Sequence, residues 1–107
     1  MKKVLSLIRG WFGSRSAVPL YHLEVTLYTR RGCHLCEDAW QLLGREQRRH
    51  GFALRAVDID TSAELAARYG ECVPVVEVGG KVRFRGGVNG VLLRRLCRAA
   101  AMRVRHA

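Results

Sequence analysis

The chain is short and basic, and its length leaves room for one domain. It has 107 residues, with 19 lysines and arginines against 9 aspartates and glutamates, which gives a formal net charge of +10. A chain of this length can bury one hydrophobic core, and a hydrophobic share of 49% is ordinary for a globular protein. We therefore expect these residues to form one domain, and the charge predicts attraction to anionic partners without choosing among them.

The basic residues gather at the two ends of the chain, which raises the question of a nucleic-acid partner. No zinc-finger, RNP or helix-turn-helix pattern is present, and the few aromatic residues do not alternate with the basic ones as a base-stacking surface requires. We therefore expect a solvated arginine face on the last helix, a monomer, and no binding of nucleic acid.

Residues 1–21 are expected to form an extension before a domain at residues 22–107. Arg9 interrupts the first apolar run too early for a secretory signal or a membrane span, which predicts a cytoplasmic protein. Contact with an anionic membrane surface is one interpretation of this basic, amphipathic segment; a flexible or packed extension is the one we favour. Its apolar residues fall roughly on one helical face: Val4, Leu5, Ile8, Trp11 and Phe12.

The predicted elements follow the order β-α-β-α-β-β-α. Residues 23–28 alternate in polarity as a strand does. A helix follows, with Leu35, Ala39, Leu42 and Leu43 at helical spacing, and ends at His50-Gly51; Trp40, at a helical position, is expected to pack. Phe52 to Ile59 is the next strand, and the capping box Thr61-Ser62-Ala63-Glu64 predicts a short helix that ends before Gly70.

The C-terminal part is predicted to be a hairpin and a helix. Residues 75–78 and 82–85 flank Gly79-Gly80, a two-residue hairpin signal, and residues 91–104 place Cys97 on the apolar face of the last helix. We expect Cys97 to be buried and inert. Strands joined through a helix run parallel, and a hairpin is antiparallel, so the sequence predicts a mixed four-stranded sheet with helices on both faces.

The segment Cys33-His34-Leu35-Cys36 lies where the first strand gives way to the first helix. A cysteine at a helix N-terminus faces unpaired backbone N–H groups and the positive end of the peptide dipoles, so its thiolate is stabilised. Cys36 follows one helical turn later, within reach of a disulfide. The pattern predicts a redox pair in which Cys33 is the nucleophile and Cys36 resolves.

Several segments together resemble a divergent branch of the glutaredoxin-like proteins, in the thioredoxin superfamily. They are Tyr28 to Cys36, Val57-Asp58-Ile59-Asp60, Val73-Pro74-Val75 and Gly86-Gly87. The resemblance implies a thioredoxin-like α/β fold over about residues 22–100 and a dithiol reaction at the cysteine pair.

The same resemblance implies where a thiol substrate would bind. Arg30, three residues before the nucleophile, would bind the glutathione carboxylate, and Val73-Pro74, expected to allow a cis bond, would pair with the substrate backbone. Gly86-Gly87 would receive the other end of glutathione. The following Val88-Asn89 lacks the carboxylate usual in the family, and His-Leu replaces the usual Pro-Tyr between the cysteines.

His34 and Cys72 carry further expectations. An imidazolium beside a thiolate favours the reduced pair, so His34 is expected to tune the redox potential. Cys72 is a candidate third thiol near the pair. A metal site made of these residues is disfavoured, because structural zinc sites usually show two paired motifs.

The predicted reaction is thiol–disulfide exchange on protein or glutathione disulfides. No cofactor is expected in the protein, and recycling requires glutathione or an external flavin-linked reductase. The competing hypothesis is a thioredoxin-like binding module, or a metal or iron–sulfur carrier that uses Cys33 with Cys36 or Cys72.

Overall fold

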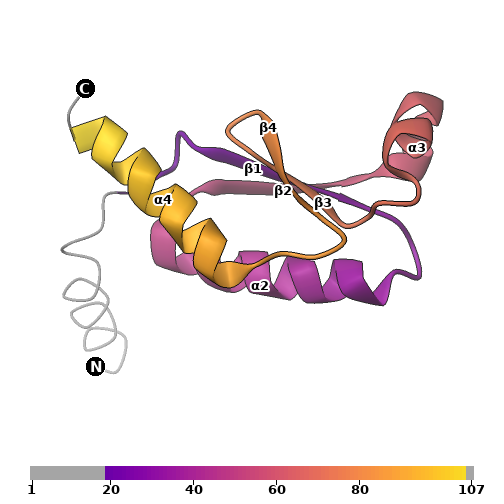
Figure 1. The fold of residues 1–107 in the computed structure, drawn as a ribbon, viewed down its shortest axis with the longest axis horizontal. Helices are drawn as coiled ribbons and strands as arrows, with labels where there is room; N and C mark the ends of the chain where they lie inside the picture. The colour runs from indigo at the N-terminus through magenta and orange to yellow at the C-terminus, as the bar shows by residue number, and fades with distance from the viewer. Residues whose placement is uncertain (1–18, 106–107) are drawn as a thin grey trace, which may run out of the picture.

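The strands pair into one mixed sheet in the order β2-β1-β3-β4 (Figure 1). This computed structural model describes residues 19–105. β1 (Glu24–Thr29) runs parallel to β2 (Ala53–Asp58) and antiparallel to β3 (Val75–Val78), which pairs antiparallel with β4 (Lys81–Arg85). The parallel β1–β2 pair follows from the helical connection and the antiparallel β3–β4 pair from the hairpin, so the predicted element order and mixed sheet are confirmed.

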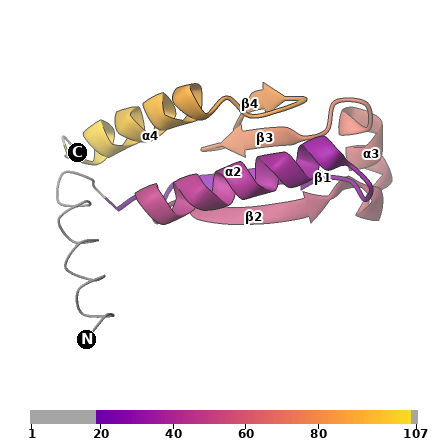
Figure 2. The same cartoon turned by 90° about the horizontal axis from the view of Figure 1, so that it is seen from below.

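Two long helices cover one face of the sheet. α2 (His34–His50) and α4 (Gly90–Arg105) lie side by side on this face (Figure 2), and their apolar residues meet alternate residues of the strands. Cys97 belongs to this core and is buried, as predicted. The largest fully buried members are Leu20, Leu27, Leu43, Phe52 and Leu93.

Among the described residues, the helices on the opposite face lie near one end of the sheet. A 3₁₀-helix, η1 (Ile59–Thr61), leads into α3 (Ala63–Tyr69), which lies at the end of the sheet beyond β1 (Figure 1). A second small cluster of buried residues lies there and shares no residue with the main core; it consists of Ile59, Tyr69 and Val75. Helices therefore lie on both faces, which is the thioredoxin-like arrangement that the sequence predicts.

The cap of α3 differs from the predicted one. Ser62 is the N-cap, and its Oγ accepts a hydrogen bond from the Leu65 N–H at 3.2 Å. Thr61 belongs to η1 instead, and its hydroxyl donates to the Asp58 carbonyl oxygen at 2.7 Å. The predicted capping box is therefore wrong: the N-cap lies one position later because the 3₁₀ turn takes up Thr61, and Leu65 rather than Glu64 stands three residues after the cap.

The expected N-terminal extension lies mostly outside the described residues, which begin at Pro19. Leu20, placed in that extension by the sequence, packs in the main core with 1% of its surface exposed, and its N–H donates to the His50 carbonyl oxygen at 3.1 Å. The amphipathic face expected over residues 4–12 falls on undescribed positions. Within residues 19–105, no helix has the length and apolar character needed to cross a membrane.

Candidate redox site

Cys33 stands at the junction between β1 and α2, as the sequence predicts. Gly32 has a φ of 74°, a left-handed conformation that glycine adopts at no steric cost, and it turns the chain from the strand into the helix. Cys33 itself is the N-cap of α2, and its Sγ accepts a hydrogen bond from the Cys36 N–H at 3.1 Å. The sulfur thus takes the place of the capping oxygen that usually satisfies a free N–H at this end.

Cys33 and Cys36 are joined by a disulfide, with Cα atoms 5.1 Å apart. The two residues differ in exposure: Cys33 is partly exposed, whereas Cys36 has 2% of its surface accessible. An incoming disulfide can therefore approach Cys33 but not Cys36. This asymmetry supports the predicted division into a nucleophile and a resolving thiol.

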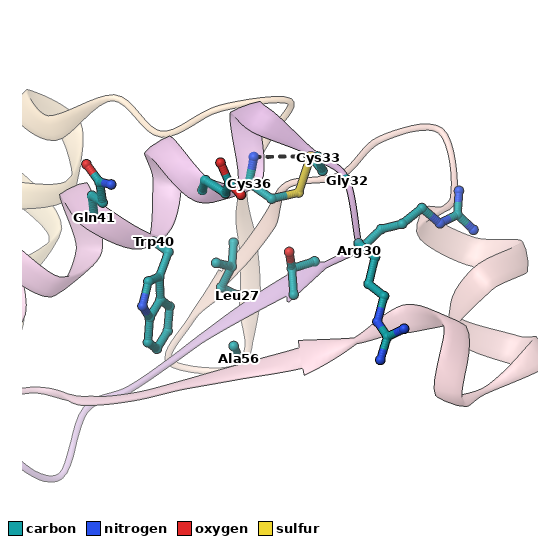
Figure 3. A pocket seen from close by; sticks show the side chains of 11 residues that line it. Leu27, Arg30, Gly32, Cys33, Cys36, Trp40, Gln41 and Ala56 are labelled. Atoms are coloured by element: carbon teal, nitrogen blue, oxygen red, sulfur yellow. Dashed lines mark hydrogen bonds between the residues drawn. A yellow bond between two sulfur atoms is a disulfide. The ribbon is translucent and has the colours of Figure 1, made fainter.

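A cavity of about 750 Å³ opens beside the disulfide, between α2 and the strand pair β1–β2 (Figure 3). Both cysteines line it, together with the loop that precedes them and the exposed side of α2. The other lining residues are Leu27, Thr29, Arg30, Arg31, Gly32, Glu37, Trp40, Gln41 and Ala56. The redox pair therefore faces a hollow large enough for more than one substrate group.

Trp40 lines this cavity, a position that the sequence did not indicate. Its helical position suggested that it packs in the core, but 43% of its surface is exposed. Figure 3 shows its indole ring reaching from α2 toward the strands, with Leu27 and Ala56 nearby. Leu35, placed on the apolar face by its spacing, is also exposed, at 56%.

Arg30 lines the cavity but is held by neighbouring elements. Its Nε and Nη2 each donate to the Asp60 carboxylate at 2.9 Å, and its Nη1 donates to the Gly70 carbonyl oxygen at 3.0 Å. These hydrogen bonds and the Arg30 charge hold the pKa of the Asp60 carboxyl below its ordinary value. The guanidinium thus links the end of β1 to η1 and to the end of α3.

The loops proposed to contact substrate lie together on the other side of β1. Val73-Pro74 is a cis peptide bond, as the sequence allowed. The Gly86 N–H lies 3.0 Å from the Cys72 carbonyl oxygen and 2.8 Å from that of Pro74, which joins the Gly86-Gly87 turn to the proline loop. None of Val73, Pro74, Gly86 and Gly87 lines the cavity beside the cysteines.

Asn89 belongs to the Val88-Asn89 pair, which lacks the carboxylate usual in the family, and it caps the last helix. Its Oδ1 accepts hydrogen bonds from the N–H groups of Val91 and Leu92 at 3.0 and 3.1 Å. An asparagine is among the residues best suited to this position, so a local structural role accounts for it.

His34 and Cys72 lie in different environments. The His34 side chain is 95% exposed, and its Nδ1 is 3.8 Å from a carboxylate oxygen of Glu37. Cys72 is half-buried and packs against the cluster of Ile59, Tyr69 and Val75. Over residues 19–105, no three histidine, cysteine or acidic side chains come together as metal ligands would.

The family profile described as a glutaredoxin-like domain (DUF836) matches residues 24–98. The chain belongs to this glutaredoxin-like family. A structural genomics target protein from X. campestris, XcR50, is 32% identical over 70% of this chain and 96% of its own, with a TM-score of 0.59. No curated protein matches the chain.

The chain is also similar to other solved structures. Protein Ne2328 from Nitrosomonas europaea is 26% identical over 69% of this chain and 89% of its own, with a TM-score of 0.61. A glutaredoxin from Archaeoglobus fulgidus is 25% identical, covers 69% and 85% of the two chains, and gives a TM-score of 0.50. A mutant thioredoxin from Halobacterium salinarum, 18% identical over 74% of both chains with a TM-score of 0.59, shares the fold. A glutaredoxin-like domain with a bonded C-x-x-C pair supports thiol–disulfide redox chemistry.

Proposed function

We propose that this glutaredoxin-like domain reduces disulfides of proteins or of glutathione through the Cys33–Cys36 dithiol. The observation that carries the proposal is the asymmetry of the pair. Cys33 is accessible at the helix N-terminus, and its Sγ accepts a hydrogen bond from the Cys36 N–H, whereas Cys36 is buried behind it. Both features suit an attacking thiolate followed by a protected resolving thiol.

The reaction proceeds by two exchanges. In the reduced protein, the Cys33 thiolate attacks one sulfur of the substrate disulfide, and the other substrate sulfur leaves as a thiolate and takes up a proton. The Cys36 thiol loses its proton and attacks Cys33 Sγ, which releases the second substrate thiol and forms the Cys33–Cys36 disulfide. The substrate gains two electrons, and the protein loses two.

An external thiol or a flavin-linked reductase must restore the dithiol. We propose glutathione as a reductant and as part of a mixed-disulfide substrate, with Val73-Pro74 and Gly86-Gly87 contacting its backbone. Arg30 is the cation expected for the glutathione carboxylate, but its three donors toward Asp60 and Gly70 are already used. Binding of glutathione at Arg30 would therefore compete with a structural link.

Steady-state turnover with two reducing systems tests the proposal. The wild-type protein is offered bis(2-hydroxyethyl) disulfide and an insulin disulfide, with either glutathione and its reductase or a thioredoxin reductase. We expect turnover with one of these donors and its loss in Cys33→Ser. Cys36→Ser should accumulate a mixed disulfide that mass spectrometry detects.

Cys97→Ala is the matched control, because this thiol is buried away from solvent. It should leave turnover within about twofold of wild type. Absence of turnover with both donors, in a protein whose reduced Cys33 also fails to form a mixed disulfide, would reject the oxidoreductase and favour the binding module.

A further inference from the structure

The cavity beside the disulfide lies on the opposite side of β1 from the proline loop. Thr29, at the end of β1, pairs with Asp58 of β2, whereas its neighbour Tyr28 pairs with Val75 of β3, directly after Pro74. The cavity is lined from the β2 side, by Ala56. A substrate held by the proline loop would therefore leave this cavity free for the group on the other side of its disulfide.

The inner part of the cavity is apolar. Leu27 and Ala56 are direct partners across the parallel ladder of β1 and β2; Ala56 is exposed at the floor of the cavity, and Leu27 is buried beside it in the main core. The Trp40 ring extends from α2 toward them and leaves 43% of its surface exposed (Figure 3). An exposed indole above an apolar floor offers a face on which a ring or a large apolar side chain can pack.

Two opposite charges lie at the rim. Arg31 is exposed and, within residues 19–105, forms no ion pair, whereas the adjacent Arg30 is occupied by Asp60. Glu37 lines the cavity from the first turn of α2 and is 72% exposed. Of the two arginines that line the cavity, Arg31 is thus the one available to bind an anion, and the negative charge of Glu37 repels an anion placed near the helix.

We propose that this cavity is a substrate subsite for disulfides that carry an aromatic or large apolar group, with a carboxylate that binds Arg31. The inference rests on the proposed dithiol reaction and names the substrates that react fastest. Trp40 and Ala56, which are exposed to the cavity, bind the apolar group, and Arg31 binds the acid. A carboxylate next to an aromatic group fits the combination better than a neutral aliphatic disulfide does.

Three small disulfides separate these contributions in single-turnover reactions of the reduced protein. 5,5′-Dithiobis(2-nitrobenzoate) is aromatic and anionic, 4,4′-dithiodipyridine is aromatic and neutral, and bis(2-hydroxyethyl) disulfide is aliphatic and neutral. The rate constant with each aromatic reagent is divided by that with the aliphatic one. This ratio cancels any change in the nucleophilicity of Cys33, and comparison with wild type cancels the intrinsic reactivity of each reagent.

The variants have distinct expected results. Trp40→Ala should lower both aromatic ratios by about 2- to 10-fold, the range of an aromatic packing contact. Arg31→Gln should lower only the ratio for 5,5′-dithiobis(2-nitrobenzoate), the anionic reagent, by about 3- to 10-fold, as expected for a partly screened charge-assisted contact. We call this ratio the anionic ratio. Glu37→Gln should change the anionic ratio in the opposite direction and raise it.

Controls of the same type lie elsewhere on the surface. Arg45→Gln removes a positive charge, as Arg31→Gln does, and Asp38→Asn removes a negative charge, as Glu37→Gln does. Both positions are exposed on α2 and do not line the cavity. Leu92→Ala removes an exposed apolar side chain from α4. These should leave all ratios within about twofold of wild type. Circular dichroism and the aliphatic rate constant confirm that each variant is folded and active.

The outcomes separate the two proposals. Ratios that stay unchanged in Trp40→Ala and Arg31→Gln, or that change equally in the control variants, overturn the subsite while the retained aliphatic reaction leaves the dithiol function intact. Failure of the reduced wild type to react with any of the three disulfides overturns the proposed function, and the subsite with it.

Discussion

Cys97 and Cys33 show how position in the fold changes the chemistry of one side chain. Burial, together with the charge of Glu46, raises the pKa of the Cys97 thiol to about 11. Cys33 instead meets a backbone N–H at a helix N-terminus, the environment that favours a thiolate. The two thiols are expected to differ in reactivity at neutral pH, with Cys33 the one that reacts.

The buried Cys97 thiol predicts a loss of stability in alkaline solution. Its pKa rises from an ordinary 9.0 to about 11 on folding, so above pH 9 the unfolded chain loses this proton first. The free energy of unfolding should then fall, by roughly 2 kcal/mol at pH 11 relative to pH 9 for this group alone. Urea denaturation at several pH values measures it.

Cys97→Ala provides the comparison, because Tyr28 also has a raised pKa and contributes a loss of the same sign. The variant should be less stable at neutral pH, since a buried atom is removed, but its stability should fall less between pH 9 and 11. Parallel pH curves for the two proteins would show that Cys97 ionises as easily in the folded state as in the unfolded chain.

At the scale of elements, Arg30 holds three segments at the site end of the sheet. It follows β1 and donates to Asp60 in η1 and to the Gly70 carbonyl oxygen after α3. We predict that Arg30→Gln lowers the melting temperature more than Asp60→Asn does, because it also removes the hydrogen bond to the Gly70 carbonyl oxygen. Because both variants remove the Arg30–Asp60 pair, the double variant should be little less stable than Arg30→Gln alone.

This double-mutant cycle also separates a structural from a substrate-binding role of Arg30. If Arg30 mainly binds glutathione, its replacement should raise the KM for glutathione, whereas Asp60→Asn should not. Equal effects of the two variants on KM would favour the structural link. Strictly additive losses in melting temperature would contradict the pairing itself.

Glu46 of α2 and Arg94 of α4 connect the two helices over the core. The Arg94 Nε and Nη2 donate to Glu46 at 3.2 and 3.1 Å, and His50 Nε2 lies 3.3 Å from the same carboxylate. Burial of Glu46 alone would raise its pKa, but the hydrogen bonds and charge of Arg94, together with the charges of Arg49 and His50, outweigh burial, and the pKa lies below its ordinary value.

We predict that Glu46→Gln lowers the free energy of unfolding by about 1–3 kcal/mol, the range for a charge-assisted hydrogen bond. Arg94 is partly exposed and can turn its charge to water, so the cost stays below that of a fully buried pair. Arg98→Gln, an exposed change on the same helix, is the control. Chemical denaturation that finds both variants equal to wild type would show that the contact adds nothing.

The elements were predictable because their signals are local. Alternation and helical spacing located the strands and helices, and Gly79 and Gly80 adopt the positive φ of 60° and 84° that their hairpin requires. The errors arose where position relative to the sheet decides burial. Leu35 and Trp40 have the spacing of core residues, but both remain exposed on α2.

At the scale of the whole molecule, the sequence located the cysteine pair but could not show how its surroundings assemble. The helix start identifies Cys33 and Cys36 by local spacing. Arg30 is paired with a residue thirty positions away, and the cavity depends on β1, β2 and α2 meeting. Tertiary contacts of this kind leave no periodic pattern in one sequence, so the sequence did not show that Arg30 is paired whereas the adjacent Arg31 has no ion pair within residues 19–105.

The net charge of +10 predicts an opposite salt dependence for anionic and cationic substrates. A basic protein attracts anions before contact, and salt screens this attraction, because the Debye length shortens from about 30 Å at 0.01 M to about 3 Å at 1 M. The rate of the reduced protein with glutathione disulfide should fall several-fold between low and high salt. The rate with cystamine, which is cationic, should rise.

Bis(2-hydroxyethyl) disulfide is the neutral control in this experiment, and its rate should change by less than about twofold over the same range. Exposed arginines of α4 contribute to the field, since Arg95, Arg98 and Arg103 lie on its solvent side. Replacing all three by glutamine should flatten both salt curves while leaving the neutral rate unchanged. If the three disulfides respond alike to salt, the charge of the chain does not act at Cys33, and selection among substrates must come from contacts in the cavity alone.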